Sequence, residues 1–228
     1  MIPLDIISDP ICPWCYIGKA RLDAAIAELG HDPFIRRWRI FRLNPDMPRE
    51  GMERQAYLDA KFGGREGADR IYGRIEAVAR ESGLETRFDL IRRTPDTLDA
   101  HRLLRWAEAE GVQNAVADGL FRSYFVEGAD ISAPEVLTAI AGEAGMDGAV
   151  VARLLEGEAD RAELAAEDDE ARRMGVSGVP CFVINGRYVI QGAQETETWV
   201  RVIRELSAAI AEAEAGNGDG AAPGGATP

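Results

Sequence analysis

The hydrophobic pattern near the N-terminus changes from strand to helix and back to strand. Residues 3–8 form a short aliphatic run that stops at an Asp-Pro turn signal, as expected of a buried strand. Residues 16–29 carry apolar positions at helical spacing, and Gly30 follows where a helix-ending glycine belongs. Residues 34–41 then alternate as a second strand. The pattern predicts a β-α-β unit with Cys12 at its strand-to-helix junction.

The middle of the chain, from about residue 52 to 174, shows many helix signals and almost no strand signal. Residues 65–80 form an amphipathic stretch. Thr94-Pro95 predicts another helix start, with threonine as the N-cap and proline at the first helical position. The segment 132–135, Ser-Ala-Pro-Glu, matches a capping box, and Asp147 is expected to cap the next helix. We therefore expect a long all-helical block.

Strand signals return after this block. Residues 181–184 and 187–190 are apolar runs separated by Asn185-Gly186, a strong hairpin signal because both central residues of a type I′ turn need positive φ. A helix is predicted over 195–214. The residues after it, 215–228, are rich in glycine and have too few large apolar side chains to offset the entropy of ordering, which predicts a disordered tail.

Removing the helical block leaves the element order of a thioredoxin fold. The predicted class is α/β, a thioredoxin fold with a large all-helical insertion. Residues 1–48 and 175–214 would form one discontinuous thioredoxin-like domain, and residues 49–174 the helical insertion domain.

Composition and charge narrow the expected partners and location. The chain of 228 residues carries a formal net charge of -13 and has a pI of about 4.7, so its field repels phosphate backbones and anionic lipid surfaces. No run approaches the roughly 20 apolar residues that cross a bilayer. The first residues lack the features of a signal peptide. We expect a cytoplasmic protein with neither nucleic acid nor membrane as a partner.

The Cys12-Pro13-Trp14-Cys15 motif carries the strongest chemical signal. At a helix start, exposed backbone N–H groups and the helix dipole stabilise a thiolate, which makes Cys12 the expected nucleophile. Cys15, one turn further along, can attack a mixed disulfide on Cys12 and release the partner. Pro13 suits a helix start, and Trp14 offers an apolar surface beside the sulfur. Both are predicted to contact substrate and tune the reduction potential.

A zinc site is the main alternative for the cysteine pair. Such a site needs four ligands, and only Cys181, His31 and His101 remain, none of which repeats the spacing of the pair. Three cysteines in a chain of this length also cannot form a disulfide scaffold. We therefore expect redox chemistry and no metal.

Five segments together resemble the FrnE-like branch of the DsbA family, and the resemblance runs from residue 2 to about 206. The segments are residues 8–18 around the dithiol, 43–48, 100–103, 178–180 and 192–194. Since both cysteines are present, the resemblance implies dithiol oxidoreductase activity. It also implies a cis peptide before Pro180, with Pro180 against the dithiol and the backbone of Val179 free to pair with substrate. A homodimer is implied as well.

Other polar residues near these motifs are weaker candidates. Asn44, at the end of the second strand, could contact a ligand or only form a turn. His101, on a predicted helix, could line the cleft and exchange protons, although a buried histidine more often only hydrogen bonds. Asp5 and Asp9 flank the first strand, and either could act as a buried proton acceptor, although solvated surface positions are expected. Cys181, after Pro180, is expected to be buried and inert, or else a third thiol near Cys12.

One departure from the branch, and the similarity of the branch to other enzymes, leave the function open. Asp96-Thr97 stands where the branch is expected to have Asn-Thr, which weakens a ligand contact there. The branch is also similar to 2-hydroxychromene-2-carboxylate isomerases and kappa-class glutathione transferases, which place serine at the nucleophile position.

The leading hypothesis is a thiol–disulfide oxidoreductase acting on protein or small-molecule thiols and disulfides. No bound cofactor is expected, and glutathione is a candidate thiol co-substrate. The alternatives are a glutathione-dependent isomerase or transferase and a redox-sensing binding protein without turnover.

Overall fold

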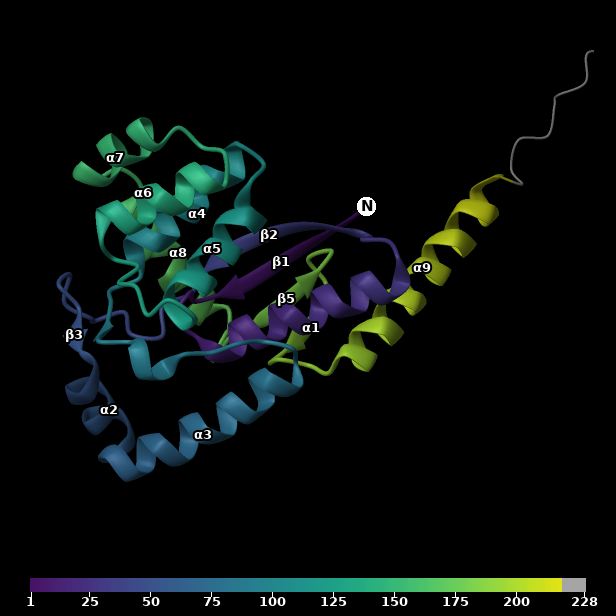
Figure 1. Ribbon diagram of the computed structural model, residues 1–228. Helices are drawn as coiled ribbons and strands as arrows, with labels where there is room; N and C mark the ends of the chain where they lie inside the picture. Colours follow the sequence, from purple (N-terminus) through teal and green to yellow (C-terminus); the bar gives the residue numbers. More distant parts are fainter. Residues whose placement is uncertain (219–228) are drawn as a thin grey trace, which may run out of the picture.

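A four-stranded sheet forms the centre of the computed structural model, which describes residues 1–218, with Arg65 and residues 211–218 described by backbone only (Figure 1). The strand order is β2-β1-β5-β6. β1 (Ile2–Ser8) pairs in parallel with β2 (Phe34–Ile40) and antiparallel with β5 (Cys181–Ile184), which pairs with β6 (Tyr188–Gln191). The thioredoxin fold predicted from the sequence is confirmed.

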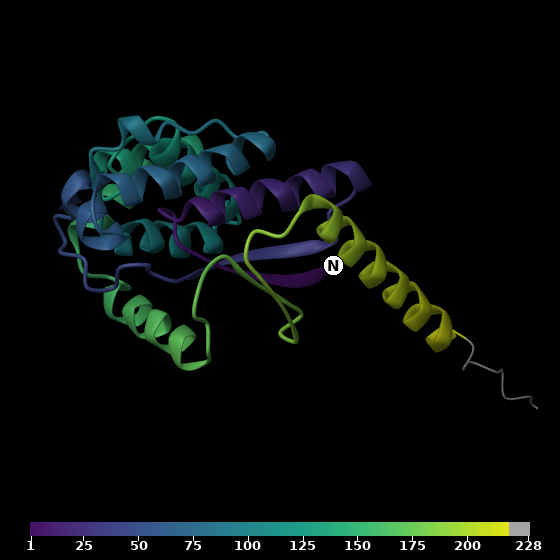
Figure 2. The same cartoon turned by 90° about the horizontal axis from the view of Figure 1, so that it is seen from below.

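Helices cover both faces of this sheet. α1 (Pro13–Leu29) and α9 (Thr196–Gly218) pack together on one face, where the Phe182 and Trp199 rings meet at 4.8 Å. α8 (Arg161–Arg173) lies on the opposite face, and Figure 2 shows α1 and α8 on the two sides of the strands. Because side chains alternate along a strand, β1 sends Leu4, Ile6 and Ser8 towards one face and Ile7 towards the other.

The helical insertion predicted between β2 and β5 is confirmed, with one addition. A short two-stranded sheet, β3–β4, lies within it, although the sequence shows almost no strand signal there. In chain order, the elements of the insertion are β3 (Met52–Glu53), α2 (Arg54–Phe62), α3 (Arg65–Glu81), the 3₁₀ helix η1 (Phe88–Leu90), β4 (Arg93–Thr94), α4 (Leu98–Ala109), α5 (Gln113–Phe125), α6 (Pro134–Glu143), α7 (Gly148–Glu156) and α8.

Two predicted helix starts are wrong. Thr94 does not cap a helix, because it pairs with Met52 in the β3–β4 ladder, and α4 begins at Leu98. Ser132 does not form a capping box, because its hydroxyl donates to Asp130 Oδ1 at 2.6 Å and α6 begins at Pro134. In both cases the predicted cap residue is hydrogen bonded to another partner and does not cap the helix.

Other local predictions are confirmed. Asp147 caps α7 through the amides of Ala149 and Val150. Asn185 and Gly186 have φ of 52° and 65°, as the two-residue hairpin requires. α9 continues to Gly218, so residues 215–218 of the predicted tail are helical, and residues 219–228 lie outside the described part of the chain.

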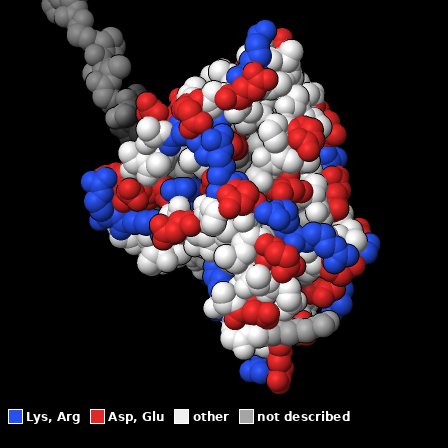
Figure 3. All heavy atoms as spheres, turned by 90° about the vertical axis from the view of Figure 1, so that its left-hand side faces the viewer, with Lys and Arg blue, Asp and Glu red and all other residues white. Residues whose placement is uncertain are grey.

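The charged side chains are mixed rather than gathered by sign. On the face shown in Figure 3, acidic and basic residues alternate between patches of uncharged surface. Within residues 1–218, no helix is both long and apolar enough to span a membrane.

Close packing of α1 against the Pro180 loop gives a test of this fold. A Cβ on Gly18 would lie 3.0 Å from Pro180 Cγ and 3.4 Å from Phe182 Cζ. We expect Gly18→Val to lower the free energy of unfolding by about 1–3 kcal/mol, because overpacking forces the two segments apart. Urea unfolding measures this change. Gly142→Val, where a Cβ meets nothing within 4 Å, is the control. Equal stability of the two variants would contradict this packing.

Candidate active site

The dithiol lies at the start of α1. Cys12 is the N-cap residue with extended backbone (φ -85°, ψ 112°), and Pro13 begins the helix as predicted. The amide of Cys15 donates to the Cys12 carbonyl at 3.0 Å, which closes the first turn. Both cysteines carry free thiols and are buried, with 3% and 1% of their surfaces exposed. The N-terminal end of the helix, with the positive end of its dipole, therefore lies at Cys12.

The loop before β5 faces the dithiol. The Val179-Pro180 peptide bond is cis, as the resemblance implies. The Cys12 thiol donates to the Val179 carbonyl, with 3.7 Å between Sγ and the oxygen. Residues far apart in the sequence thus meet at the reactive sulfur.

Cys15 lies deeper, beside the end of β1. Burial raises the pKa of the Cys15 thiol well above its ordinary value, and the adjacent Cys12 sulfur raises it further. The Ser8 hydroxyl and the Asp9 backbone N–H face the sulfur and lower this pKa. Ser8 Oγ has no other hydrogen-bond partner among the described residues. Cys15 is therefore held as a protonated thiol at neutral pH.

Asp9 is not at the solvated position that we expected, because it is fully buried under the dithiol turn. Its carboxylate accepts from the amides of Leu43 at 2.7 Å and Ile11 at 3.4 Å, and the Thr97 side chain also hydrogen bonds to it. Burial nevertheless dominates and raises the pKa of Asp9 from 3.8 to about 7. Asp5, by contrast, is partly exposed.

His101 lies beside Asp9 and is 3% exposed. Its Nε2 atom is 3.9 Å from Asp9 Oδ1 and has no hydrogen-bond partner within the described residues. Burial, together with the Arg42 cation, lowers the pKa of His101 to about 3. The imidazole is thus neutral at neutral pH, and it lies beneath the dithiol turn.

The other predicted contact residues point in different directions. Trp14 packs with Ile75 and Ala79 of α3, which covers the start of α1. The side chain of Asn44 faces α2, where its Oδ1 accepts from Tyr57 at 3.2 Å and from Lys61 at 3.1 Å. Contact of Trp14 and Asn44 with a substrate stays a prediction.

Cys181 is buried, as expected, in a cluster separate from the dithiol. It packs with Ile7, Phe41 and Ala171 on the α8 side of the sheet, and burial raises the pKa of its thiol. Cys12 and Cys15 instead belong to the core on the α1 side. No cluster of three or more potential metal ligands occurs in residues 1–218.

Sequence reasoning missed two residues around the dithiol, Ser8 and Thr97, and it favoured a solvated position for Asp9, which is buried. One signal was present for Ser8, because it continues the inward alternation of Leu4 and Ile6. Thr97 and Asp9 are far apart in the sequence and meet only in the folded protein, so no local sequence pattern predicts their contact.

This fold and this dithiol define a thioredoxin-fold protein with a Cys-x-x-Cys turn at the start of α1. The family model described as a DSBA-like thioredoxin domain matches residues 3–204, so the chain belongs to that family.

Three similar proteins illustrate the range of the family. A probable DsbA oxidoreductase from Streptomyces coelicolor is 32% identical, with a TM-score of 0.79 over 90% of this chain and 89% of that one. The uncharacterized protein YwbO of Bacillus subtilis is 26% identical over 90% of this chain and 96% of its own. The cytosolic disulfide reductase DsbM from Pseudomonas aeruginosa, also solved with GSH, is 23% identical, with a TM-score of 0.65 over 90% and 98%.

The Asp9–His101 pair predicts a pH dependence of stability. The folded state holds the Asp9 proton more firmly, so the Asp9 contribution is full below pH 3.8 and lost as pH rises through about 7. The His101 contribution is full above pH 6.5 and lost as pH falls through about 3. The two trends oppose each other between pH 3.8 and 6.5.

Asp9→Asn should remove the first trend and leave the second. We expect its free energy of unfolding to rise with pH across this window, by up to about 1.4 kcal/mol per pH unit, more steeply than in the wild type. Urea unfolding at several pH values measures the slope. Asp5→Asn, which changes a partly exposed carboxylate, is the comparison variant. An unchanged slope in Asp9→Asn would show that Asp9 does not titrate as described.

Proposed function

We propose that this protein is a thiol–disulfide oxidoreductase that cycles Cys12 and Cys15 between dithiol and disulfide. The observation that carries the proposal is the arrangement of Cys12 at the N-terminus of α1, opposite the Val179 carbonyl and one turn before Cys15. A thiolate at this position is stabilised by the helix, and a second thiol stands ready to resolve a mixed disulfide.

The proposed reduction proceeds in two exchanges. The Cys12 thiolate attacks one sulfur of a substrate disulfide, forms a mixed disulfide and expels the other substrate sulfur as a thiolate. Cys15 then loses its proton and attacks the Cys12 sulfur, which forms the Cys12–Cys15 disulfide and releases the second substrate thiolate. Two external thiols, for which glutathione is the proposed source, restore the dithiol and are themselves oxidised to a disulfide.

The surrounding residues have distinct proposed roles. The backbone of Val179, turned to Cys12 by Pro180, would align the substrate sulfur for in-line attack. Pro13 and Trp14 would form the apolar border of the sulfur, and Asn44 would contact the substrate from the α2 side. His101, neutral and beside Asp9, would influence proton movement under the turn rather than touch substrate.

The direction we propose is reduction, in the cytoplasm, where the thiol pool keeps dithiols reduced. The similar fold of a cytosolic disulfide reductase, solved with GSH, supports this choice. A homodimer stays a prediction.

The alternative is a glutathione-dependent isomerase or transferase in which Cys12 holds or activates glutathione without net redox change of the protein. The resemblance to 2-hydroxychromene-2-carboxylate isomerases keeps this alternative open. It requires Cys12 to act without Cys15, whereas the proposed cycle requires both.

Insulin reduction with a thiol donor tests the proposal. We expect Cys12→Ser to lose disulfide reduction to background, because the nucleophile is gone. Cys15→Ala should accumulate a mixed disulfide on Cys12, because nothing resolves it, and mass spectrometry of this complex identifies the captured partner. Cys181→Ala, which alters a thiol on the other side of the sheet, should keep activity and is the control.

Three outcomes would contradict the cycle. Full insulin reduction by Cys12→Ser would exclude Cys12 as the nucleophile, and glutathione-dependent isomerisation retained in that variant would favour the alternative. A wild-type protein that forms a stable client complex but never turns over would instead act as a redox sensor.

A further inference from the structure

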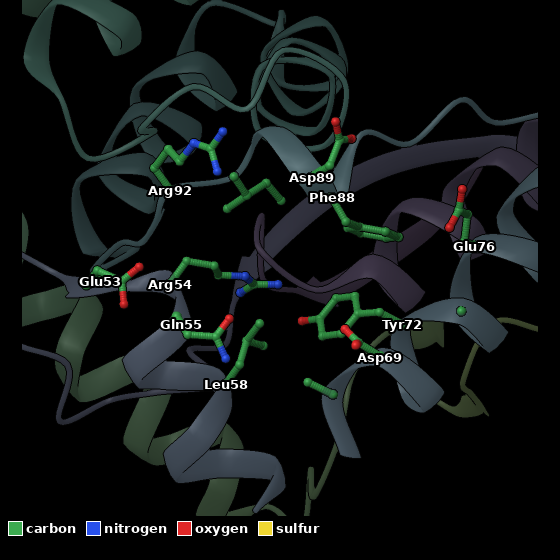
Figure 4. Close-up of a pocket in the computed structure, with 13 residues that line it drawn as sticks. Glu53, Arg54, Gln55, Leu58, Asp69, Tyr72, Glu76, Phe88, Asp89 and Arg92 are labelled. Atoms are coloured by element: carbon green, nitrogen blue, oxygen red, sulfur yellow. The ribbon is translucent and has the colours of Figure 1, made fainter. Parts of the chain in front are cut away.

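A cavity of about 530 Å³ lies between α2, α3 and η1, away from the thiols themselves. Its apolar wall contains Leu58, Ala68, Phe88 and Ile91. Figure 4 shows Arg54 from α2 and Tyr72 from α3 pointing towards one another across its centre. Cavities of this size with an apolar wall and a few convergent polar groups are typical of small-molecule sites.

Arg54 is the unusual residue of this cavity. It is 9% exposed, and its guanidinium lies over two aromatic rings, 4.9 Å from the centre of Tyr72 and 5.7 Å from that of Tyr57. Its Nη1 donates to Thr94 Oγ1 at 3.1 Å. Among the described residues, no carboxylate lies within ion-pair distance of this cation, so the groups around it are aromatic rings and hydroxyls.

A buried cation without an anion is costly, because its lost hydration is only partly replaced by neutral groups. Aromatic faces recover some of this free energy through cation–π attraction. A carboxylate that entered the cavity would supply the missing charge, and the flat guanidinium could bind it through two parallel hydrogen bonds.

The carboxylates around the cavity limit what can enter. Glu53 accepts from the Ala56 amide, and Asp89 pairs with Arg87, so both already have partners of their own. With Asp69 and Glu76, which also line the cavity, they make its surroundings negative, and Arg92 offsets only part of this charge (Figure 4). A ligand with one carboxylate meets Arg54 at modest electrostatic cost, whereas a dianion would be repelled.

We propose that this cavity is a binding site for a small organic monocarboxylate, whose carboxylate pairs with Arg54 and whose apolar body contacts Leu58, Phe88 and Ile91. The cavity is not lined by Cys12, Cys15 or Val179, so the site does not depend on the dithiol cycle.

Benzoate, benzamide and phthalate are matched probes for this site. They share one ring and carry one, no and two carboxylates. In calorimetric titration of the full chain we expect benzoate to bind and the other two to bind at least about tenfold more weakly. Benzamide lacks the charged hydrogen bond to Arg54, and the second carboxylate of phthalate is repelled by the carboxylates around the cavity. Arg54→Gln should weaken benzoate by about tenfold to a hundredfold. Cys12→Ser should bind benzoate like the wild type.

A cavity-blocking variant makes the test independent of Arg54. Gly73 of α3 lines the cavity, and a Cβ there meets nothing within 4 Å, so Gly73→Leu should fold and fill the entrance. Gly142→Leu, a helical glycine in α6 with equally free space, is the matched control. We expect loss of benzoate binding in the first variant only.

Three results would refute the proposed site or the role of Arg54 in it. No benzoate binding by the wild type at up to about 10 mM, or unchanged binding in folded Gly73→Leu, would refute the site. Benzamide binding as tightly as benzoate would refute the role of Arg54. Because Cys12→Ser is inactive in insulin reduction yet expected to bind benzoate, failure of this site and failure of the dithiol cycle are read separately.

Discussion

The buried carboxylate of Asp9 is the contact on which the active-site geometry depends. It accepts hydrogen bonds from Ile11 in the dithiol turn, from Leu43 after β2, and from Thr97 before α4. One side chain thus joins the dithiol turn, the central sheet and the helical insertion. Burying an acid is unfavourable, so its pKa is raised to about 7, and the three donors explain why the site still accepts it.

The helical insertion is fixed to the sheet by the same kind of contact. Asp168 of α8 is fully buried and accepts from the Arg42 amide at 2.9 Å and from its guanidinium at 3.2 Å. Gln113 at the start of α5 exchanges hydrogen bonds with the backbone of Trp38 in β2, at 2.7 and 3.1 Å. Buried polar groups that are fully paired in this way specify one arrangement of two packed units, which apolar contact alone would leave less defined.

Local signals predicted the parts of the molecule whose structure is determined locally. The β-α-β unit, Gly30 and the Asn185-Gly186 hairpin followed from periodicity and from backbone conformations that few residues adopt. The predicted caps at Thr94 and Ser132 were wrong because both residues have other partners. Thr94 pairs with Met52, which is distant in the sequence, and Ser132 donates to Asp130, a contact that the capping pattern does not predict. The predicted solvated position of Asp9 was wrong because Asp9 is buried by segments that meet only in the folded protein.

The thioredoxin-like part and the helical insertion affect the proposed reaction in different ways. The dithiol turn and the Val179 carbonyl come from the thioredoxin-like part, and they would perform exchange on any accessible disulfide. Cys12 is only 3% exposed, however, and the neighbouring Trp14 packs against the cluster that contains Ile75 and Ala79 of α3. The insertion therefore limits approach to the sulfur. Substitutions in α3 should change which substrates react, whereas substitutions at the turn should change whether any substrate reacts.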